Sequence, residues 1–285
     1  MSAGVDVDGL ALEAQPIALR VAEIYLRHTG NAFVGLVTHG SAVKRTSAPA
    51  QPPSDRGAAG VEPGPGGGGQ AQAKRARTDF ILNMSDLDFQ LYLRPALGDG
   101  QGPLPLKIGL AIQGELAAID PAPFAYIQGY AHAGVTRAGW IGPVPSAYTV
   151  IAGTLPIPEA TAAELTAAAR RDLAEIPARL ASLPQGLLDT GSGSLGRRAR
   201  LLLTDVWPAL RQVVTLQTAE PIAAWQMTKT EAIDALEGEA LRTTGRAVHE
   251  AAWALSAEVD SLDAQLAVIR TGADFLAAAD AWVRR

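Results

Sequence analysis

Residues 33–44 read FVGLVTHGSAVK and residues 80–93 read FILNMSDLDFQLYL. In the first stretch, the apolar run from Phe33 to Val37 predicts a short buried strand. In the second, polar and apolar residues alternate from Asp88 to Leu93, as they do in a half-buried strand. Each predicted strand borders a short polar motif, so we expect these motifs to converge at one end of the strands.

The neighbouring segments predict further elements of a mixed domain. The apolar spacing that begins at Pro16 indicates a helix that Gly30 can end. The remaining candidates are a helix over Leu106–Ile119 and strands over Phe124–Ala131 and Tyr148–Ile151. Together they predict an α+β domain over residues 1–155, with a small mixed sheet and flanking helices. Residues 1–14 are predicted to be loosely ordered.

The composition changes from Glu159 onward, where Ala, Leu, Glu and Arg dominate. We expect a helical bundle over residues 156–285. The predicted helices cover residues 159–181, 195–217, 221–237 and 240–283, with breaks at Pro184, Gly191, Gly193 and Gly238.

A low-complexity segment interrupts the first domain. Residues 45–78 are dominated by Pro, Gly, Ala, Ser and Gln and include Gly66 to Gly69. Such a composition cannot bury enough apolar surface to offset its ordering entropy, so we predict a flexible insertion. The insertion ends in the basic cluster Lys74–Arg77, which is typical of a solvated loop end.

Composition limits the classes of function. The chain has 285 residues, 48% of them hydrophobic, a net charge of -5 and no cysteine. These values exclude disulfides and thiolate metal sites, and they make nucleic acid an improbable partner because no global positive field is present. The apolar run over Leu104–Ala118 is too short and too polar for a membrane span. Without a visible signal peptide, we expect a cytoplasmic protein.

Asp86 and Asp88 form the most informative polar pair. Residues two apart on a strand point to the same face, so their carboxylates would lie side by side. Adjacent carboxylates repel each other unless a cation lies between them. Oxygen-only ligation suits Mg²⁺, which phosphoryl and nucleotidyl transfer require. We therefore predict Asp86 and Asp88 as metal ligands and catalytic residues.

Gly40 and Ser41 offer the complementary half of a phosphate site. A glycine lets the backbone approach a phosphate closely, and a serine hydroxyl adds a donor. If a helix begins at Ser41, its N-terminus would also favour an anion. Lys44 is a further candidate for contact with a triphosphate, although an exposed loop lysine is the more common case.

These motifs resemble the DNA polymerase beta-like nucleotidyltransferase superfamily, which includes the aminoglycoside adenylyltransferases. The likeness lies in a Gly-Ser pair after a strand and an Asp-x-Asp motif on the next strand. Between Ser41 and Asp86 lie 44 residues, and removing 45–78 leaves a gap of 10, close to the family's usual spacing. The resemblance implies Mg²⁺-dependent transfer of a nucleoside monophosphate from an NTP, with ATP the expected donor, to a hydroxyl of a small molecule or protein.

The sequence departs from the family at the third carboxylate. Family members commonly carry it on the strand after the helix, but Phe124–Ala131 contains no acidic residue. Gln128 is the polar residue there, and an amide cannot act as a base near neutral pH. Asp120 or Glu115 could substitute, or metal alone could activate the acceptor. Otherwise the protein would be an impaired nucleotide-binding or partner-binding module.

Several other residues have weaker signals. The resemblance implies that the helical half faces the nucleotide, so Trp225 or Lys229 could contact it, but a core Trp and a solvated Lys are more common. We expect Arg200 on a solvated face and His39 to pack or cap its turn. The last predicted helix is amphipathic, which leaves a homodimer open.

Overall fold

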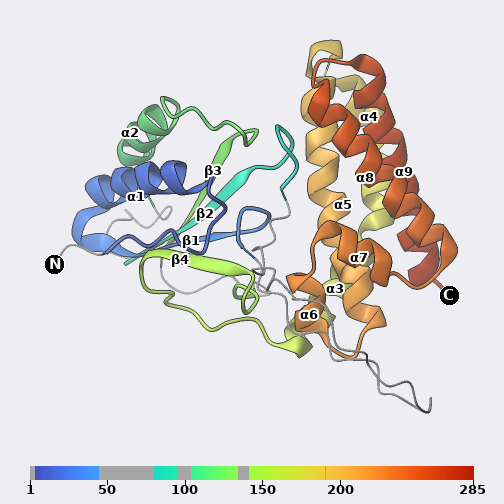
Figure 1. The fold of residues 1–285 in the computed structure, drawn as a ribbon, viewed down its shortest axis with the longest axis horizontal. Helices are drawn as coiled ribbons and strands as arrows, with labels where there is room; N and C mark the ends of the chain where they lie inside the picture. The colour runs from blue at the N-terminus through green and yellow to red at the C-terminus, as the bar shows by residue number, and fades with distance from the viewer. Residues whose placement is uncertain (1–3, 45–79, 95–103, 134–140, 190) are drawn as a thin grey trace, which may run out of the picture.

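The computed structural model describes residues 4–44, 80–94, 104–133, 141–189 and 191–285. It contains a sheet half followed by a helical half, which stands beside the sheet (Figure 1). This arrangement confirms the predicted α+β fold with a C-terminal helical region. None of the helices in these ranges combines the length and the apolar character that a membrane span needs.

The sheet is mixed, with strand order β3-β2-β1-β4. The central strand β1 (Phe33–His39) pairs antiparallel with β2 (Leu87–Leu93) and β4 (Tyr148–Gly153). Strand β3 (Ile127–Ala133) pairs parallel with β2. Because parallel strands need a crossover, helix α2 lies between these two strands in the chain.

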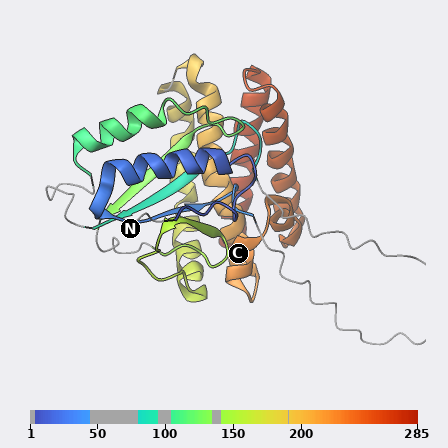
Figure 2. The ribbon, with the colours of Figure 1, turned by 60° about the vertical axis from the view of Figure 1, so that its left-hand side comes forward.

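Helices α1 (Gln15–Thr29) and α2 (Leu106–Leu116) cover the same face of the sheet (Figures 1 and 2). Glu115 joins them through contacts of 2.6 Å with His28 and 2.9 Å with Arg27. Beneath the helices, buried apolar side chains form the core of this half, and they include Ile24, Leu36, Leu87, Phe89 and Ile151.

The prediction that residues 1–14 are loosely ordered is wrong for residues 4–14. Leu10 and Ala14 are fully buried. The backbone N–H of Asp6 donates to the Ile151 carbonyl at 2.8 Å. The apolar residues of this segment have no regular spacing and so gave no periodic signal in the sequence. Tertiary packing nevertheless buries them, and β4 provides a hydrogen-bond partner for the segment's backbone. The low-complexity segment 45–78 lies outside the described residues.

The helical half contains seven α-helices in the described ranges. They are α3 (Ala162–Ala174), α4 (Ile176–Asp189), α5 (Leu195–Gln217), α6 (Pro221–Gln226), α7 (Lys229–Ala235), α8 (Glu239–Ala257) and α9 (Leu262–Val283). A short 3-10 turn at Ser192–Ser194 precedes α5, and another, in the sheet half, joins α1 to β1 at Gly30–Ala32. The predicted bounds of α5 are confirmed.

The other predicted helices are divided by caps. Thr228 caps α7 in a capping box with Glu231, so the predicted helix 221–237 splits there. Ser261 accepts from the Ala264 N–H and starts α9, which divides 240–283. The predicted helix 159–181 ends at Ala174, and Glu175 separates α3 from α4. The break expected at Pro184 is also wrong, because this exposed residue lies inside α4, where water can satisfy the freed carbonyl.

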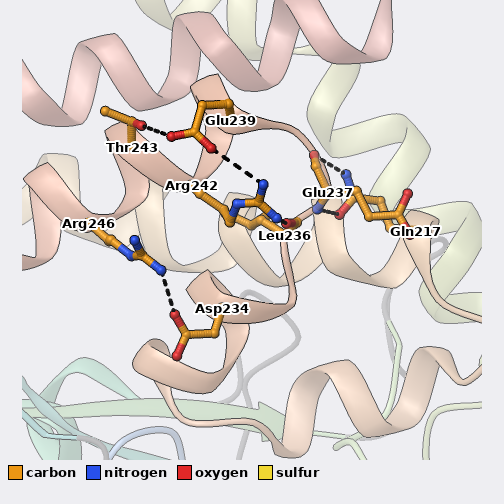
Figure 3. A network of polar contacts seen from close by, with 8 residues as sticks. All are labelled: Gln217, Asp234, Leu236, Glu237, Glu239, Arg242, Thr243 and Arg246. Atoms are coloured by element: carbon orange, nitrogen blue, oxygen red, sulfur yellow. Dashed lines mark hydrogen bonds and ion pairs between the residues drawn. The ribbon is translucent and has the colours of Figure 1, made fainter.

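Polar contacts fix the connection between α7 and α8 against the end of α5 (Figure 3). The Gln217 side chain accepts from the Glu237 N–H at 2.9 Å and donates to the Glu237 carbonyl at 3.2 Å. Arg242 donates to the Leu236 carbonyl at 3.2 Å and also contacts Glu239. These contacts hold α7, and therefore Lys229 at its first position, in place relative to α5.

The two halves interlock through short segments of the sheet half. Ile81 and Met84 pack into the apolar core of the helical half. The Asn83 side chain donates to the Ser256 carbonyl at 3.3 Å, and Gln226 donates to the Pro145 carbonyl at 2.9 Å. Because Met84 lies two residues before Asp86, this packing also positions the site described below.

Candidate functional site

A cavity of about 590 Å³ lies between the two halves. Its volume is within the ordinary range for a small-molecule site. The sheet half contributes polar residues that include His39, Gly40, Ser41, Ser85, Asp86, Asp88, Tyr126, Gln128 and Tyr130. The helical half contributes Arg200, Thr204, Trp207, Arg211, Trp225 and Lys229, among others.

The Gly40-Ser41 turn lies directly beside the acidic motif. Strand β1 ends at His39, which pairs with Asp88 on β2. Gly40 has a φ of 90°, a conformation that favours glycine. A turn follows at Ser41, and no helix begins there, so a phosphate at this turn would rely on backbone N–H groups and the hydroxyl. The Ala11 N–H donates to the Ala42 carbonyl at 2.8 Å, which secures the turn from the N-terminal segment.

Asp86 and Asp88 both line the cavity, as their spacing predicted. Asp88 belongs to β2, whereas Asp86 lies one residue before that strand. Burial, reinforced by the nearby charge of Asp86, raises the pKa of Asp88 to about 7. The charge of Asp86 therefore opposes the ionisation of Asp88, and a bound cation would relieve that opposition.

Gln128 occupies the third position beside the acid pair. It is the register partner of Asp88 across the parallel β2–β3 pairing and lines the cavity. Its amide donates to the Tyr130 hydroxyl. The structure thus brings Asp86, Asp88 and Gln128 together with the Gly-Ser turn.

The alternative third acids lie elsewhere. Glu115 is held by Arg27 and His28 on the far helices, and Asp120 accepts from the Ala122 N–H at 3.0 Å. Neither lines the cavity. Across the described part of the chain, no group of three or more His, Cys, Asp or Glu side chains could hold a metal ion.

Lys44 is not among the residues that line the cavity. Its ammonium donates to the Asp8 carbonyl at 2.9 Å. The structure therefore separates Lys44 from the other predicted nucleotide contacts and gives it a local role in holding the N-terminal segment.

The cations of the cavity come instead from the helical half. Lys229 is only 4% exposed, and its ammonium lies 5.4 Å from the centroid of the Trp207 ring. The expectation of a solvated lysine is therefore wrong. Arg211 is also buried, and its guanidinium donates to the Met227 carbonyl at 3.1 Å. Arg200, expected on a solvated face, also lines the cavity.

Arg211 was missed by sequence reasoning, although a signal exists. It is the lone cation in Ala209–Val214 of α5, a stretch whose residues are all buried. A charged residue on the buried stripe of an amphipathic helix is rare unless it is paired or functional. That pattern could have directed attention to Arg211.

His39 lines the cavity and is also held by a neighbouring strand residue. Its Nε2 lies 3.1 Å from the side-chain nitrogen of Gln90, and the Tyr92 hydroxyl donates to Gln90 at 2.7 Å. Burial is the main cause that lowers the pKa of His39. A neutral imidazole at this position leaves the acid pair as the principal charge on the sheet side of the cavity.

Comparison with models of known protein families and with curated proteins finds no match for this chain. Functional inference therefore depends on the geometry of the cavity. Two carboxylates and a Gly-Ser turn lie on one wall, while three cationic side chains belong to the other half of the protein. Such a site is suited to an anionic ligand that binds together with a metal cation, the anion facing the basic side chains and the cation facing the carboxylates.

Proposed function

We propose that the protein is a Mg²⁺-dependent nucleotidyltransferase. It would move a nucleoside monophosphate from an NTP, with ATP the expected donor, to a hydroxyl of a small molecule or protein. The observation that carries this proposal is the pairing of His39 with Asp88, because it sets the Gly40-Ser41 turn beside the acid pair in one cavity.

The donor set at the acid pair fits Mg²⁺. This ion commonly uses one or two carboxylates, with substrate phosphates and water completing its shell. Asp86 and Asp88 provide two carboxylates. The raised pKa of Asp88 supports the proposal, because a bound cation would stabilise the charged form of this carboxylate. When bound, Mg²⁺ would offset the charge on the triphosphate and on the departing pyrophosphate.

The rest of the triphosphate charge would meet the helical half. Arg200, Arg211 and Lys229 line the same cavity, and burial strengthens the interaction of a cation with phosphate. Arginine donates to phosphate in a fixed planar geometry, whereas lysine acts as a compact point charge. The proposed phosphate contacts are therefore Gly40 and Ser41 from the sheet half and these cations from the helical half, with Lys44 left out.

The cavity differs from the nucleotidyltransferases that the sequence resembles in the group that would activate the acceptor. Gln128 stands where a third carboxylate would act as base, and its amide cannot accept a proton near neutral pH. This observation favours a second candidate function, in which the protein binds NTP without transferring it. A cytoplasmic setting is part of both proposals.

The two candidates separate in a labelling experiment. Incubation with Mg²⁺ and ATP labelled at the α-phosphate, with aminoglycosides or proteins as acceptors, should yield labelled product and pyrophosphate. Asp86→Ala and Asp88→Ala should abolish transfer. Glu23→Gln removes a carboxylate from an exposed pair with Arg20 and should leave transfer unchanged. Binding of ATP without transfer would support the second candidate, and a wild-type protein that neither binds nor transfers would contradict both.

A further inference from the structure

The acid pair has a hydroxyl group of the protein in direct contact with it. Tyr126 immediately precedes β3, and its backbone carbonyl accepts from the Leu87 N–H at 3.0 Å. This bond extends the β2–β3 pairing and fixes Tyr126 beside the acidic motif. The Tyr126 hydroxyl donates to Asp86 Oδ2 at 3.1 Å, and the residue lines the cavity.

Other hydroxyls of the cavity have different surroundings. The Ser85 hydroxyl accepts from the Ile81 N–H at 2.9 Å and so belongs to the turn before β2. The Tyr130 hydroxyl is engaged by the Gln128 amide. Tyr126 is thus the lining tyrosine whose hydroxyl contacts a proposed metal ligand, the place where nucleotidyl transfer needs its acceptor oxygen.

We propose that Tyr126 is itself a nucleotide acceptor, so that the protein modifies its own chain. This inference rests on the function proposed above. A nucleophile held within the site needs no encounter with a second molecule, and such proximity can be equivalent to an effective concentration on the order of 10⁵ M. The fixed position of Tyr126 supplies this advantage without a separate acceptor subsite.

The reaction balances with the groups already present. Tyr126 Oη attacks the α-phosphorus of the NTP, and a new O–P bond forms. The bond between the α-phosphorus and the oxygen that bridges to the β-phosphorus breaks, and pyrophosphate leaves. The phenolic proton leaves to water as the O–P bond forms. The product is a nucleoside monophosphate joined to Tyr126 by a phosphodiester bond.

The full-length protein, incubated with Mg²⁺ and ATP labelled at the α-phosphate, tests this inference. Intact-mass measurement should find one added nucleoside monophosphate per chain, and peptide mapping should locate it on Tyr126. Tyr126→Phe should lose the label. Tyr148→Phe is the matched control, because the Tyr148 hydroxyl contacts Glu159 and the residue does not line the cavity.

A binding measurement on the same preparations separates the two proposals. ATP affinity is measured by calorimetry with Mg²⁺, for the wild type and for Asp86→Ala. If ATP binds with an affinity that depends on Asp86 but no label reaches the protein, the self-modification is refuted, and labelling of an added acceptor then decides the proposed function separately. Label on Tyr130 or Ser85 in place of Tyr126 would also refute it. If ATP does not bind at all, the proposed function itself fails.

A mixing experiment checks that transfer occurs within one chain. Tyr126→Phe retains the acid pair but lacks the acceptor, whereas Asp88→Asn retains the acceptor but lacks an acid. A mixture of the two should remain unlabelled, because each chain lacks one part of the site. Label on the Asp88→Asn chain would show transfer between molecules and overturn the proposed internal reaction.

Discussion

Asp88 should lower the stability of the metal-free protein, and replacing it with asparagine should raise it. Burial and the neighbouring Asp86 raise the pKa of Asp88 from 3.8 to about 7. At 1.36 kcal/mol per pKa unit, the full penalty on its charged form is about 4 kcal/mol. Screening by solvent reduces the penalty that is expressed, so we expect Asp88→Asn to increase the free energy of unfolding at pH 8 by ~2 kcal/mol.

The sign of the pH dependence follows from the raised pKa. The folded chain holds the Asp88 proton more tightly than the unfolded chain, so this group favours folding at low pH. Its contribution is lost as the pH rises from about 4 through about 7. The asparagine variant lacks this loss, and the stability difference between variant and wild type should therefore grow across the same window.

Urea unfolding at a series of pH values, in the presence of a chelator, measures this difference. Glu23→Gln is the control, because it neutralises an exposed carboxylate and should follow the wild type at every pH. Added Mg²⁺ should stabilise the wild type at pH 8 more than Asp88→Asn. A variant that is equally or less stable than the wild type across the whole range would refute the argument that Asp88 is held in an unfavourable charged state.

Three further predictions concern the remaining walls of the cavity and its turn. Lys229→Gln should weaken ATP binding ~10-fold in calorimetry, because a charge-assisted phosphate contact is lost. The control Lys107→Gln, at an exposed position of α2, should bind ATP as the wild type does. Equal ATP affinities of Lys229→Gln and the wild type would contradict the proposed phosphate contact. Gln128→Glu should accelerate label transfer by at least ~10-fold, because it supplies a base, and an unchanged rate would show that no base is needed there. Gly40→Ala should reduce the free energy of unfolding by ~1–2 kcal/mol, since its φ is positive. Gly109→Ala, within α2 and with open space around its added methyl, should instead stabilise by ~0.5–1 kcal/mol, and a stable Gly40→Ala would contradict the strain at the turn.

Local patterns were sufficient for much of the fold. The apolar run before His39 and the alternation after Asp88 predicted β1 and β2, and a composition rich in Ala, Leu, Glu and Arg predicted α5 with its bounds. The split between α6 and α7 was also readable, because Thr228 and Glu231 form the Ser/Thr-x-x-Glu signature of a capping box. In contrast, residues 4–14 are ordered by packing against residues far away in the sequence, and a short segment without periodic spacing gives no local signal of that packing.

The two walls of the site differ in how far sequence could predict them. Asp86 and Asp88 lie beside Gly40 because neighbouring strands carry them, so strand reasoning brought them together. Lys229 and Arg211 reach the cavity only because the helical half packs against the segment before β2, and no local pattern specifies that contact. Sequence therefore predicted the acid pair and the turn, offered Lys229 only as a weaker candidate through the resemblance, and missed Arg211.

The most direct measurement is a crystal structure of the protein with Mn²⁺ in place of Mg²⁺ and a non-hydrolysable ATP analogue. The anomalous signal of Mn²⁺ locates the metal without reference to any assumed ligand. We expect a peak between the carboxylates of Asp86 and Asp88, with the triphosphate extending from Ser41 toward Lys229. A metal bound elsewhere, or an analogue whose phosphates contact neither the Gly-Ser turn nor the acid pair, would contradict the proposed nucleotidyltransferase site.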